Sequence, residues 1–300
     1  MTDREKICKS YFAGRKETAS FFLEELSRAG FSRPEHLLEH VFWSNAALDE
    51  KEELFSFYAP IPEKGRFNVT SFLPGDGASY APHVEKAGDF LRLAVTSHFV
   101  LDLSETKDGE SFFKRLSQKN RKKLRWLRNA VPAKGCRVEK LENSVQFDLF
   151  EKLYCAQFPK YVSGGEEMRS LRRMYEAFCR EGKSFSFLLL SPENEPLAAS
   201  LGYISGSGFN YTHLTRARGE FDKFSPGYFL TYEVIVRLLA EHPEVQYFFM
   251  GPGEYDYKRA LLGEPFLVFR YERNTWTNLF GILRLYFRCR KERKKALLSR

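Results

Sequence analysis

Long apolar segments are missing from this chain of 300 residues. No stretch approaches 18 uncharged apolar residues, which excludes a membrane-spanning helix of ordinary length. The opening residues, MTDREKICKS, contain neither an apolar run nor a cleavage pattern, so they predict no export signal. We therefore expect a soluble protein of the cytoplasm.

Cysteine is also scarce. The five cysteines form no Cys-x-x-Cys pair, and their odd number favours reduced thiols in a cytosol over a disulfide framework. The motifs Gly-x-Ser-x-Gly, Gly-x-x-x-x-Gly-Lys and Gly-x-Gly-x-x-Gly are absent as well. No cysteine neighbours a recognisable base motif, so nothing supports a cysteine nucleophile.

Core-forming residues are plentiful. Hydrophobic residues make up 43% of the chain and aromatic residues 16%, with 29 Phe and 15 Tyr. This composition excludes a disordered or low-complexity chain, and the length suits two domains.

The net charge of +8 is unevenly distributed. Residues 114–129 carry eight basic and no acidic side chains, and residues 284–300 carry eight basic and one acidic. These two segments hold +15 together, which leaves −7 on the rest of the chain. Each segment fits either contact with phosphate, RNA or an anionic membrane, or a solvated helix face.

The first half predicts few regular elements. Helical spacing covers about 13–43 with an interruption at Pro34, and the Pro- and Gly-rich stretch 44–89 predicts loops. Residues 90–103 predict one or two strands, and 112–129 predict one basic helix that ends at Pro132 and Gly135.

The second half has a clearer pattern. Two helices are predicted first, over 145–158 and 166–180. An antiparallel meander of three strands follows, then a helix that begins at Ser225-Pro226, a strand, a short helix and a last strand; the ranges are 185–190, 197–204, 209–215, 226–239, 245–250, 254–261 and 266–271.

The helix that begins after the third meander strand is a candidate phosphate site. Its free backbone N–H groups and dipole favour an anion, and Gly227 allows close approach of a ligand. Arg216, Arg218 and Lys223 add positive charge nearby. Ser-Pro-Gly alone is also typical of a helix start that binds no ligand, where the serine only caps the helix.

Three segments resemble the acyl-CoA-dependent N-acyltransferase (GNAT) superfamily: PLAASL at 196–201, FSPGYFL at 224–230 and GPGEYDYK at 251–258. The second half is similar to the CelD-like branch, named for cellulose-biosynthesis acetyltransferases and related to Fem aminoacyl transferases. With the basic helix, the resemblance covers about 105–275. Phe249 and Arg218 stand where the family usually has acidic residues, which puts one carboxylate in doubt.

The resemblance implies an α/β (α+β) fold with a mixed central sheet and the order βββαβαβ in the C-terminal half. It divides the chain into 1–140, a smaller, degenerate GNAT-like α/β half that ends in the basic helix; 141–276, the acyltransferase domain; and 277–300, a basic amphipathic helix. This last helix either packs on the domain or lies at an anionic membrane surface.

The resemblance also implies the site. Coenzyme A would lie in a V-shaped gap between the strands 209–215 and 245–250, with acetyl-CoA or another acyl-CoA as co-substrate. The residues implied for cofactor binding are Thr215, Arg216, Lys223, Phe224, Ser225, Pro226 and Gly227. A backbone N–H at the end of the first strand would polarise the thioester.

Acyl transfer to an amine needs a proton acceptor and a donor for the departing thiolate. Glu254 is the first candidate base and Asp222 the second, with Tyr257 as the donor. His213 and Lys258 are candidate substrate-binding residues. Helix-dipole complementation, packing and an i,i+4 ion pair are the competing interpretations for Glu254, Tyr257 and Lys258.

The acceptor is expected to be an amino group on a sugar, a sugar nucleotide or a small metabolite. Two alternatives stay open: a Fem-like transferase that uses aminoacyl-tRNA, and a non-catalytic protein that binds RNA or an anionic membrane. His36 and His40 match His-x-x-Glu-His, but no third ligand can be named, so we predict no metal site.

Overall fold

A computed structural model describes residues 7, 10, 28, 66–70, 84–87, 90–253, 255–273, 283 and 287. Nine strands of this part of the chain form one sheet, with the path β1-β9-β3-β8-β7-β6-β5-β4 and β2 paired to β3. The strands are β1 (Arg66–Thr70), β2 (Val84–Ala87), β3 (Phe90–Asp102), β4 (Arg137–Lys140), β5 (Phe187–Leu190), β6 (Pro196–Ser205), β7 (Gly208–Arg216), β8 (Tyr247–Pro252) and β9 (Glu264–Arg273).

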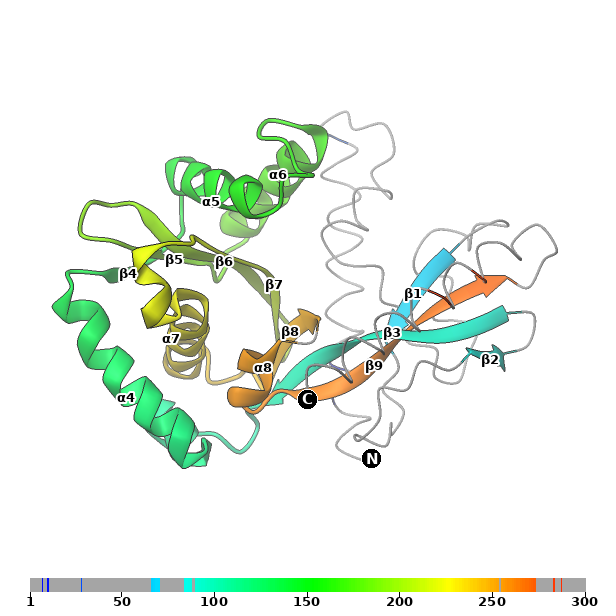
Figure 1. The fold of residues 1–300 in the computed structure, drawn as a ribbon, viewed down its shortest axis with the longest axis horizontal. Coiled ribbons are helices and arrows are strands. Elements are labelled where there is room, and N and C mark those ends of the chain that lie inside the picture. Colours follow the sequence, from blue (N-terminus) through cyan, green and yellow to red (C-terminus); the bar gives the residue numbers. More distant parts are fainter. Residues whose placement is uncertain are drawn as a thin grey trace.

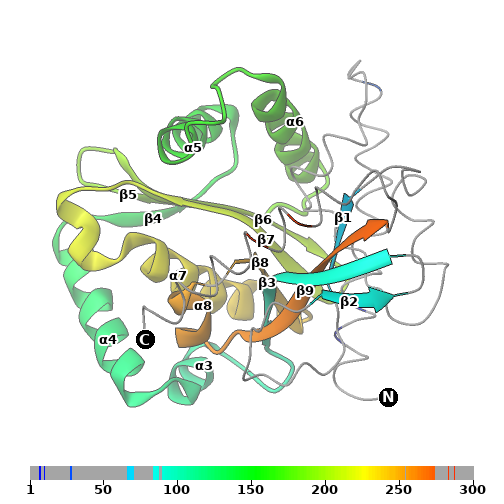
Figure 2. The same ribbon diagram turned by 45° about the vertical axis from the view of Figure 1, so that its right-hand side comes forward.

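Helices cover both faces of the sheet's β4–β8 end (Figures 1 and 2). One face carries α5 and α6, and the other carries α3, α4, α7 and α8. Their bounds are α3 (Gly109–Arg115), α4 (Gln118–Ala133), α5 (Ser144–Gln157), α6 (Glu166–Arg180), α7 (Pro226–Glu241) and α8 (Asp256–Ala260), and a 3₁₀ helix, η2 (Glu220–Phe224), precedes α7.

The burial pattern explains why these segments take these forms. All four residues of β5, Phe-Leu-Leu-Leu, are buried, as expected for a strand covered on both faces. In α6 the buried residues recur at helical spacing, and they face the sheet together with those of α5. A larger hydrophobic cluster fills the opposite side, between the sheet and α3, α4 and α7.

The order βββαβαβ predicted for the C-terminal half is confirmed as β5-β6-β7-α7-β8-α8-β9, with η2 between β7 and α7. The two helices before it, α5 and α6, are confirmed as well. The first half differs more from its prediction. The stretch 44–89, predicted as loops, contains β1 and β2, which complete their hydrogen bonding on β9 and β3.

The basic segment forms two helices instead of one. Leu116 ends α3 in extended backbone, and the Ser117 side chain accepts a hydrogen bond from the Asn120 N–H at the start of α4. Pro132 does not end α4 but lies in its last turn. The predicted helices at 13–43 and 277–300 lie outside the described residues, apart from a few isolated positions.

Strand β3, from the first half of the chain, pairs with two strands of the second half. It pairs with β8 along one edge and with β9 along the other, both antiparallel. The sheet therefore runs across residue 140, the boundary between the two domains predicted above, and that division stays a prediction.

Candidate active site

The strands β7 and β8 pair in parallel, whereas every other pair in the described sheet is antiparallel. Their pairing covers only Gly208–Asn210 against Tyr247–Phe249, although β7 continues to Arg216 and β8 to Pro252. Beyond Asn210 the two strands separate, as the resemblance implied. A bulge in the β6–β7 ladder, opposite Leu201 and Gly202, lies where this separation begins.

The N-terminus of α7 lies at the far end of β7. Ser225 precedes the helix in left-handed backbone (φ 46°), and its side chain accepts no capping hydrogen bond. Ser225 therefore occupies the N-cap position of α7, but its side chain does not cap the helix. Pro226 occupies the first turn as predicted, and the N–H groups of Gly227 and Tyr228 have no side-chain cap.

Gly227 faces the end of β7. A methyl group at this position would lie 3.6 Å from the Leu214 side chain and 3.7 Å from the Arg216 side chain. These are ordinary contacts, so the glycine is not required by packing within the protein. Its missing side chain leaves room for a methyl group between the first turn of α7 and the end of β7.

The basic helix α4 contributes a cation to the same place. The Lys123 ammonium donates a hydrogen bond of 3.0 Å to the Ser225 hydroxyl, and it lies 4.7 Å from the centre of the Tyr228 ring. Partial burial, with the charge of Lys119, lowers the pKa of Lys123. The sequence motifs place α4 in the family-like region but do not predict this contact.

Two predicted site residues pair with each other. The Arg216 guanidinium donates to the Asp222 carboxylate at 2.7 Å, and both side chains are nearly half exposed. Lys223 is also exposed and lies 5.2 Å from the centre of the Phe224 ring, which is itself buried. These groups surround the start of α7, at the end of β7 away from the β7–β8 pairing.

Gln157, at the end of α5, was missed by sequence reasoning. Its side-chain oxygen accepts hydrogen bonds from the Thr215 hydroxyl at 2.8 Å and from the Arg216 N–H at 2.7 Å. Thr215 is fully buried. Gln157 thus holds the end of β7 from the α5 side, a contact across 58 residues that no local pattern in the sequence signals.

Tyr257 on α8 approaches the other end of the separated strands. Its pKa is raised well above 10, first because of burial and then because of the neighbouring Tyr211 and Tyr255 hydroxyls. Tyr211 lies on β7 directly after the last residue paired with β8. The Tyr257 phenol is therefore protonated at neutral pH, and it lies beside the place where the strands separate.

Lys258 lies inside the protein. It is 1% exposed, its ammonium donates to the Gly251 carbonyl at 2.8 Å, and it lies 5.4 Å from the centre of the Phe99 ring. This bond ties α8 to the end of β8. Glu254, the first candidate base, lies outside the described residues.

His213 lies on the α5 face of β7. Its ring meets the rings of Phe150 and Tyr154 edge to face, with centroids 6.2 Å and 5.4 Å away, and its Nδ1 is buried without a hydrogen-bond partner. Burial lowers the pKa of His213 to about 4, so the ring is neutral at pH 7. Its role in substrate binding stays a prediction.

Where the family usually has acidic residues, Phe249 is buried in a small cluster with Val100, Tyr247 and Phe266, and Arg218 is exposed. Hydrophobic packing therefore replaces one of the two expected carboxylates.

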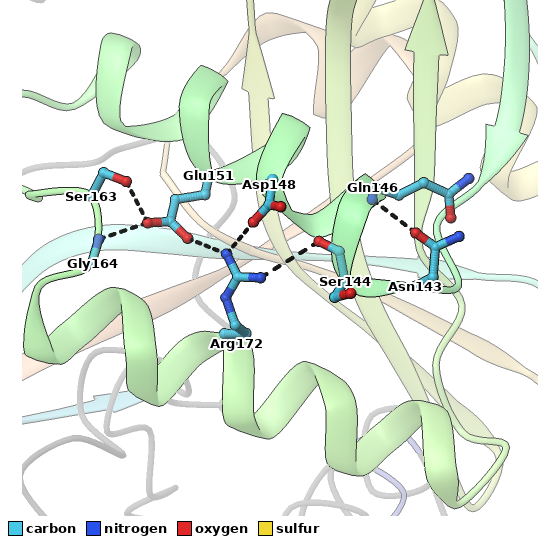
Figure 3. Close-up of polar contacts among 8 residues, drawn as sticks. All are labelled: Asn143, Ser144, Gln146, Asp148, Glu151, Ser163, Gly164 and Arg172. Atoms are coloured by element: carbon cyan, nitrogen blue, oxygen red, sulfur yellow. Dashed lines mark hydrogen bonds and ion pairs between the residues drawn. The ribbon is translucent and has the colours of Figure 1, made fainter.

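A polar network fixes the loop between α5 and α6 (Figure 3). The Glu151 carboxylate accepts hydrogen bonds from the Ser163 hydroxyl at 2.7 Å, the Gly164 N–H at 2.8 Å and the Arg172 guanidinium at 2.7 Å. Arg172 also binds Asp148 at 2.5 Å. This network orders the loop that lies on the same side of the sheet as His213.

Within the residues that the structure describes, no group of three or more His, Cys, Asp or Glu side chains could hold a metal ion. His36 and His40 lie outside those residues. Across the same described residues, no helix is long and apolar enough to cross a membrane.

Residues 114–259 match the family model described as an acetyltransferase (GNAT) domain. This region begins in α3 and ends in α8, and it contains α4, β7, α7 and β8. The match covers just under half of the chain and supports a GNAT-type acetyltransferase domain over these residues; assignment to the CelD-like branch stays a prediction.

Solved structures to which this chain is similar include FemX, at 12% identity over 76% of each chain with a TM-score of 0.48. Others are L-PGS from Bacillus licheniformis, at 12% identity over 65% of each chain and 0.44, and a GCN5-related N-acetyltransferase from Sphaerobacter thermophilus, at 9% identity over 75% of this chain and 65% of that chain and 0.40. No curated protein sequence matches this chain.

Proposed function

We propose that this protein transfers an acetyl or other acyl group from coenzyme A to an amino group of a small acceptor. The observation that carries the proposal is that two features lie at the two ends of the part of β7 that is not paired with β8. The α7 N-terminus, without a side-chain cap, lies at Arg216, and the protonated Tyr257 lies at Tyr211, where β7 leaves β8.

The length between these ends suits the donor. Tyr211 and Arg216 are five residues apart, about 17 Å of extended strand at ~3.3 Å per residue. An extended pantetheine arm has a comparable length. A pyrophosphate at the first turn of α7 would then bring the thioester to the region of Tyr211.

The chemistry assigns roles at each end. At α7, the N–H groups of Gly227 and Tyr228 and the Lys123 ammonium would bind the pyrophosphate. At the other end, Tyr257 would donate its proton to the departing thiolate, since its phenol is neutral. Asp222 is paired with Arg216 at the phosphate end, which disfavours it as the base. Glu254, directly before Tyr255, is retained as the first candidate.

The acceptor is proposed to be the amine of a sugar, a sugar nucleotide or a small metabolite, bound on the α5–α6 face near His213. The cytoplasm, which supplies acyl-CoA, is the proposed place of action.

A second candidate is a Fem-like transfer from aminoacyl-tRNA. The observation that favours it is α4, which carries six basic and no acidic side chains in Gln118–Ala133 and contacts the start of α7 through Lys123. RNA backbones bind such surfaces through counterion release.

The test compares Tyr257→Phe with Tyr255→Phe, since Tyr255 is a neighbouring tyrosine that is 57% exposed. Acetyl-CoA is supplied with a panel of amines, and the release of free thiol is followed. We expect Tyr257→Phe to lower kcat by about 10²-fold or more, with KM for acetyl-CoA nearly unchanged, and Tyr255→Phe to retain activity. Absence of acetyl-CoA binding by the wild-type protein would refute the proposed donor, and wild-type turnover by Tyr257→Phe would refute the assigned acid.

A further inference from the structure

The helix α4 carries an exposed aromatic residue beside the donor site. Trp126 is 48% exposed, and one side of its indole stacks on the Phe224 ring with centroids 5.6 Å apart and planes 15° from parallel. Phe224 is the last residue of η2 and is followed directly by Ser225. This tryptophan leaves about half of its apolar surface in contact with water, so it adds less to the hydrophobic core than a fully buried ring would.

The position of α4 is held by contacts at two places. The Asn120 amide donates to the Ala260 carbonyl of α8 at 2.9 Å, and Lys123 donates to Ser225 at the start of α7. Figure 1 shows α4 on the same side of the sheet as α7 and α8. Trp126 is therefore presented at a defined place next to the first turn of α7.

Lys123 and Trp126 are three residues apart on one helix, so their side chains are neighbours on the same face. The pair combines an ammonium group with an aromatic plane, and the region holds further cations in Lys119 and Lys223 but no acidic residue of α4. A ligand that joins a phosphate to a flat ring matches this pair.

We propose that Lys123 and Trp126 bind the adenine nucleotide end of the donor, with the base stacked on the open part of the indole and a phosphate on the ammonium. This inference rests on the proposed function, because a donor whose pyrophosphate lies at Gly227 must leave the site over Ser225 and Lys123. The same adenine chemistry occurs in coenzyme A and at the 3′ end of tRNA, so the experiment must separate the two.

The experiment measures dissociation constants by calorimetry for coenzyme A, for acetyl-pantetheine, which lacks the nucleotide, and for a short RNA that ends in CCA. The variants are Trp126→Ala, Trp126→Phe and Lys123→Met. Lys134→Met is the matched control, because it removes a positive charge from the end of the same helix about 17 Å from Lys123, at ~1.5 Å per residue. The melting temperature of each variant confirms that it folds, as expected for exposed positions.

We expect Trp126→Ala to weaken coenzyme A binding about 10-fold or more and to leave acetyl-pantetheine binding unchanged, since stacking of a base on an aromatic side chain is worth about that much. Trp126→Phe restores most of the affinity, Lys123→Met weakens it, and Lys134→Met does not. Normal coenzyme A binding by Trp126→Ala overturns this inference while the proposed function stands.

If the wild-type protein binds the CCA-ending RNA but not coenzyme A, and Trp126→Ala weakens that binding, the nucleotide site stands and the acyl-CoA donor is refuted. If the wild-type protein binds neither probe, both proposals fail.

Discussion

The network around Glu151 makes a quantitative prediction about stability. Glu151 and Asp148 both receive Arg172, yet they differ in burial: the Glu151 side chain is 7% exposed and the Asp148 side chain 62%. The perturbation is Arg172→Ala, which removes one partner from a buried carboxylate and one from an exposed carboxylate (Figure 3). Asp148→Ala is the matched control, since it removes only the exposed part.

The expected loss of stability depends on the hydrogen bonds that Glu151 retains in the variant. An exposed ion pair contributes about 0–1 kcal/mol, so Asp148→Ala is expected to cost less than about 1 kcal/mol. Loss of one partner of a buried pair costs about 3–5 kcal/mol, but Glu151 retains the Ser163 and Gly164 donors. We therefore expect about 2–3 kcal/mol for Arg172→Ala, a decrease in Tm of roughly 5–10 °C.

The effect should also depend on pH. Burial by itself raises the pKa of Glu151, but the hydrogen bonds from Ser163, Arg172 and Gly164 and the charge of Arg172 lower it below 4.5 overall. A carboxyl whose pKa is lowered in the folded state stabilises the protein above its unfolded pKa, and this contribution is lost as the pH falls through the folded pKa. The difference between the wild type and Arg172→Ala should therefore shrink as the pH falls below the reference pKa of glutamate, about 4.3, and through the lowered folded pKa.

The assay is urea denaturation of the wild type and both variants at pH 7 and in acid, with thermal melts alongside. Equal costs for Arg172→Ala and Asp148→Ala, or a cost below about 0.5 kcal/mol for Arg172→Ala, would show that burial of Glu151 does not set the strength of this network.

Two further predictions concern β7 and the start of α7. Gly227→Ala should fold normally, because its methyl group would meet Leu214 and Arg216 at ordinary distances. It should weaken coenzyme A binding about 10-fold, because the methyl group would occupy the place proposed for the phosphate at the first turn of α7. Unchanged affinity in calorimetry would contradict the phosphate site. His213→Leu should remove a pH dependence of stability. Because the pKa of His213 falls from 6.5 to about 4 on folding, its contribution to stability is complete above pH 6.5 and is lost progressively as the pH falls toward 4. If the urea midpoint of the variant declines over this pH range as much as that of the wild type, other groups cause the dependence.

Local patterns predicted the second half of the fold well. Helical spacing in α6 and the apolar run of β5 each report burial on a nearby face, and Pro226 at the start of α7 reports a single allowed backbone angle. The same reasoning failed for β1 and β2, whose partners in β9 and β3 make them strands. Composition at 44–89 resembles a loop because edge strands tolerate Pro and Gly nearby.

The residues of the candidate site also differ in whether a local sequence pattern could predict them. Tyr257 and Gly227 were reached from short motifs, and the structure brings both to the separated part of β7. Ser225 lies at the N-cap position of α7, but its side chain does not cap the helix; its backbone is left-handed and its hydroxyl accepts a hydrogen bond from Lys123. Gln157 and Trp126 were not found, because each acts on a residue more than 50 positions away in sequence.

The sequence by itself determined the element order of the second half, its buried faces and the short segments at the proposed donor site, since each depends on residues within a few positions of one another. It also located the two basic segments against a net negative remainder. Only the tertiary structure decided that β3 lies between β8 and β9, that β7 and β8 part after Asn210, and that α4 delivers Lys123 and Trp126 to the start of α7. These features depend on which distant segments pack together, and that choice is made by burial and hydrogen bonding across the whole sheet.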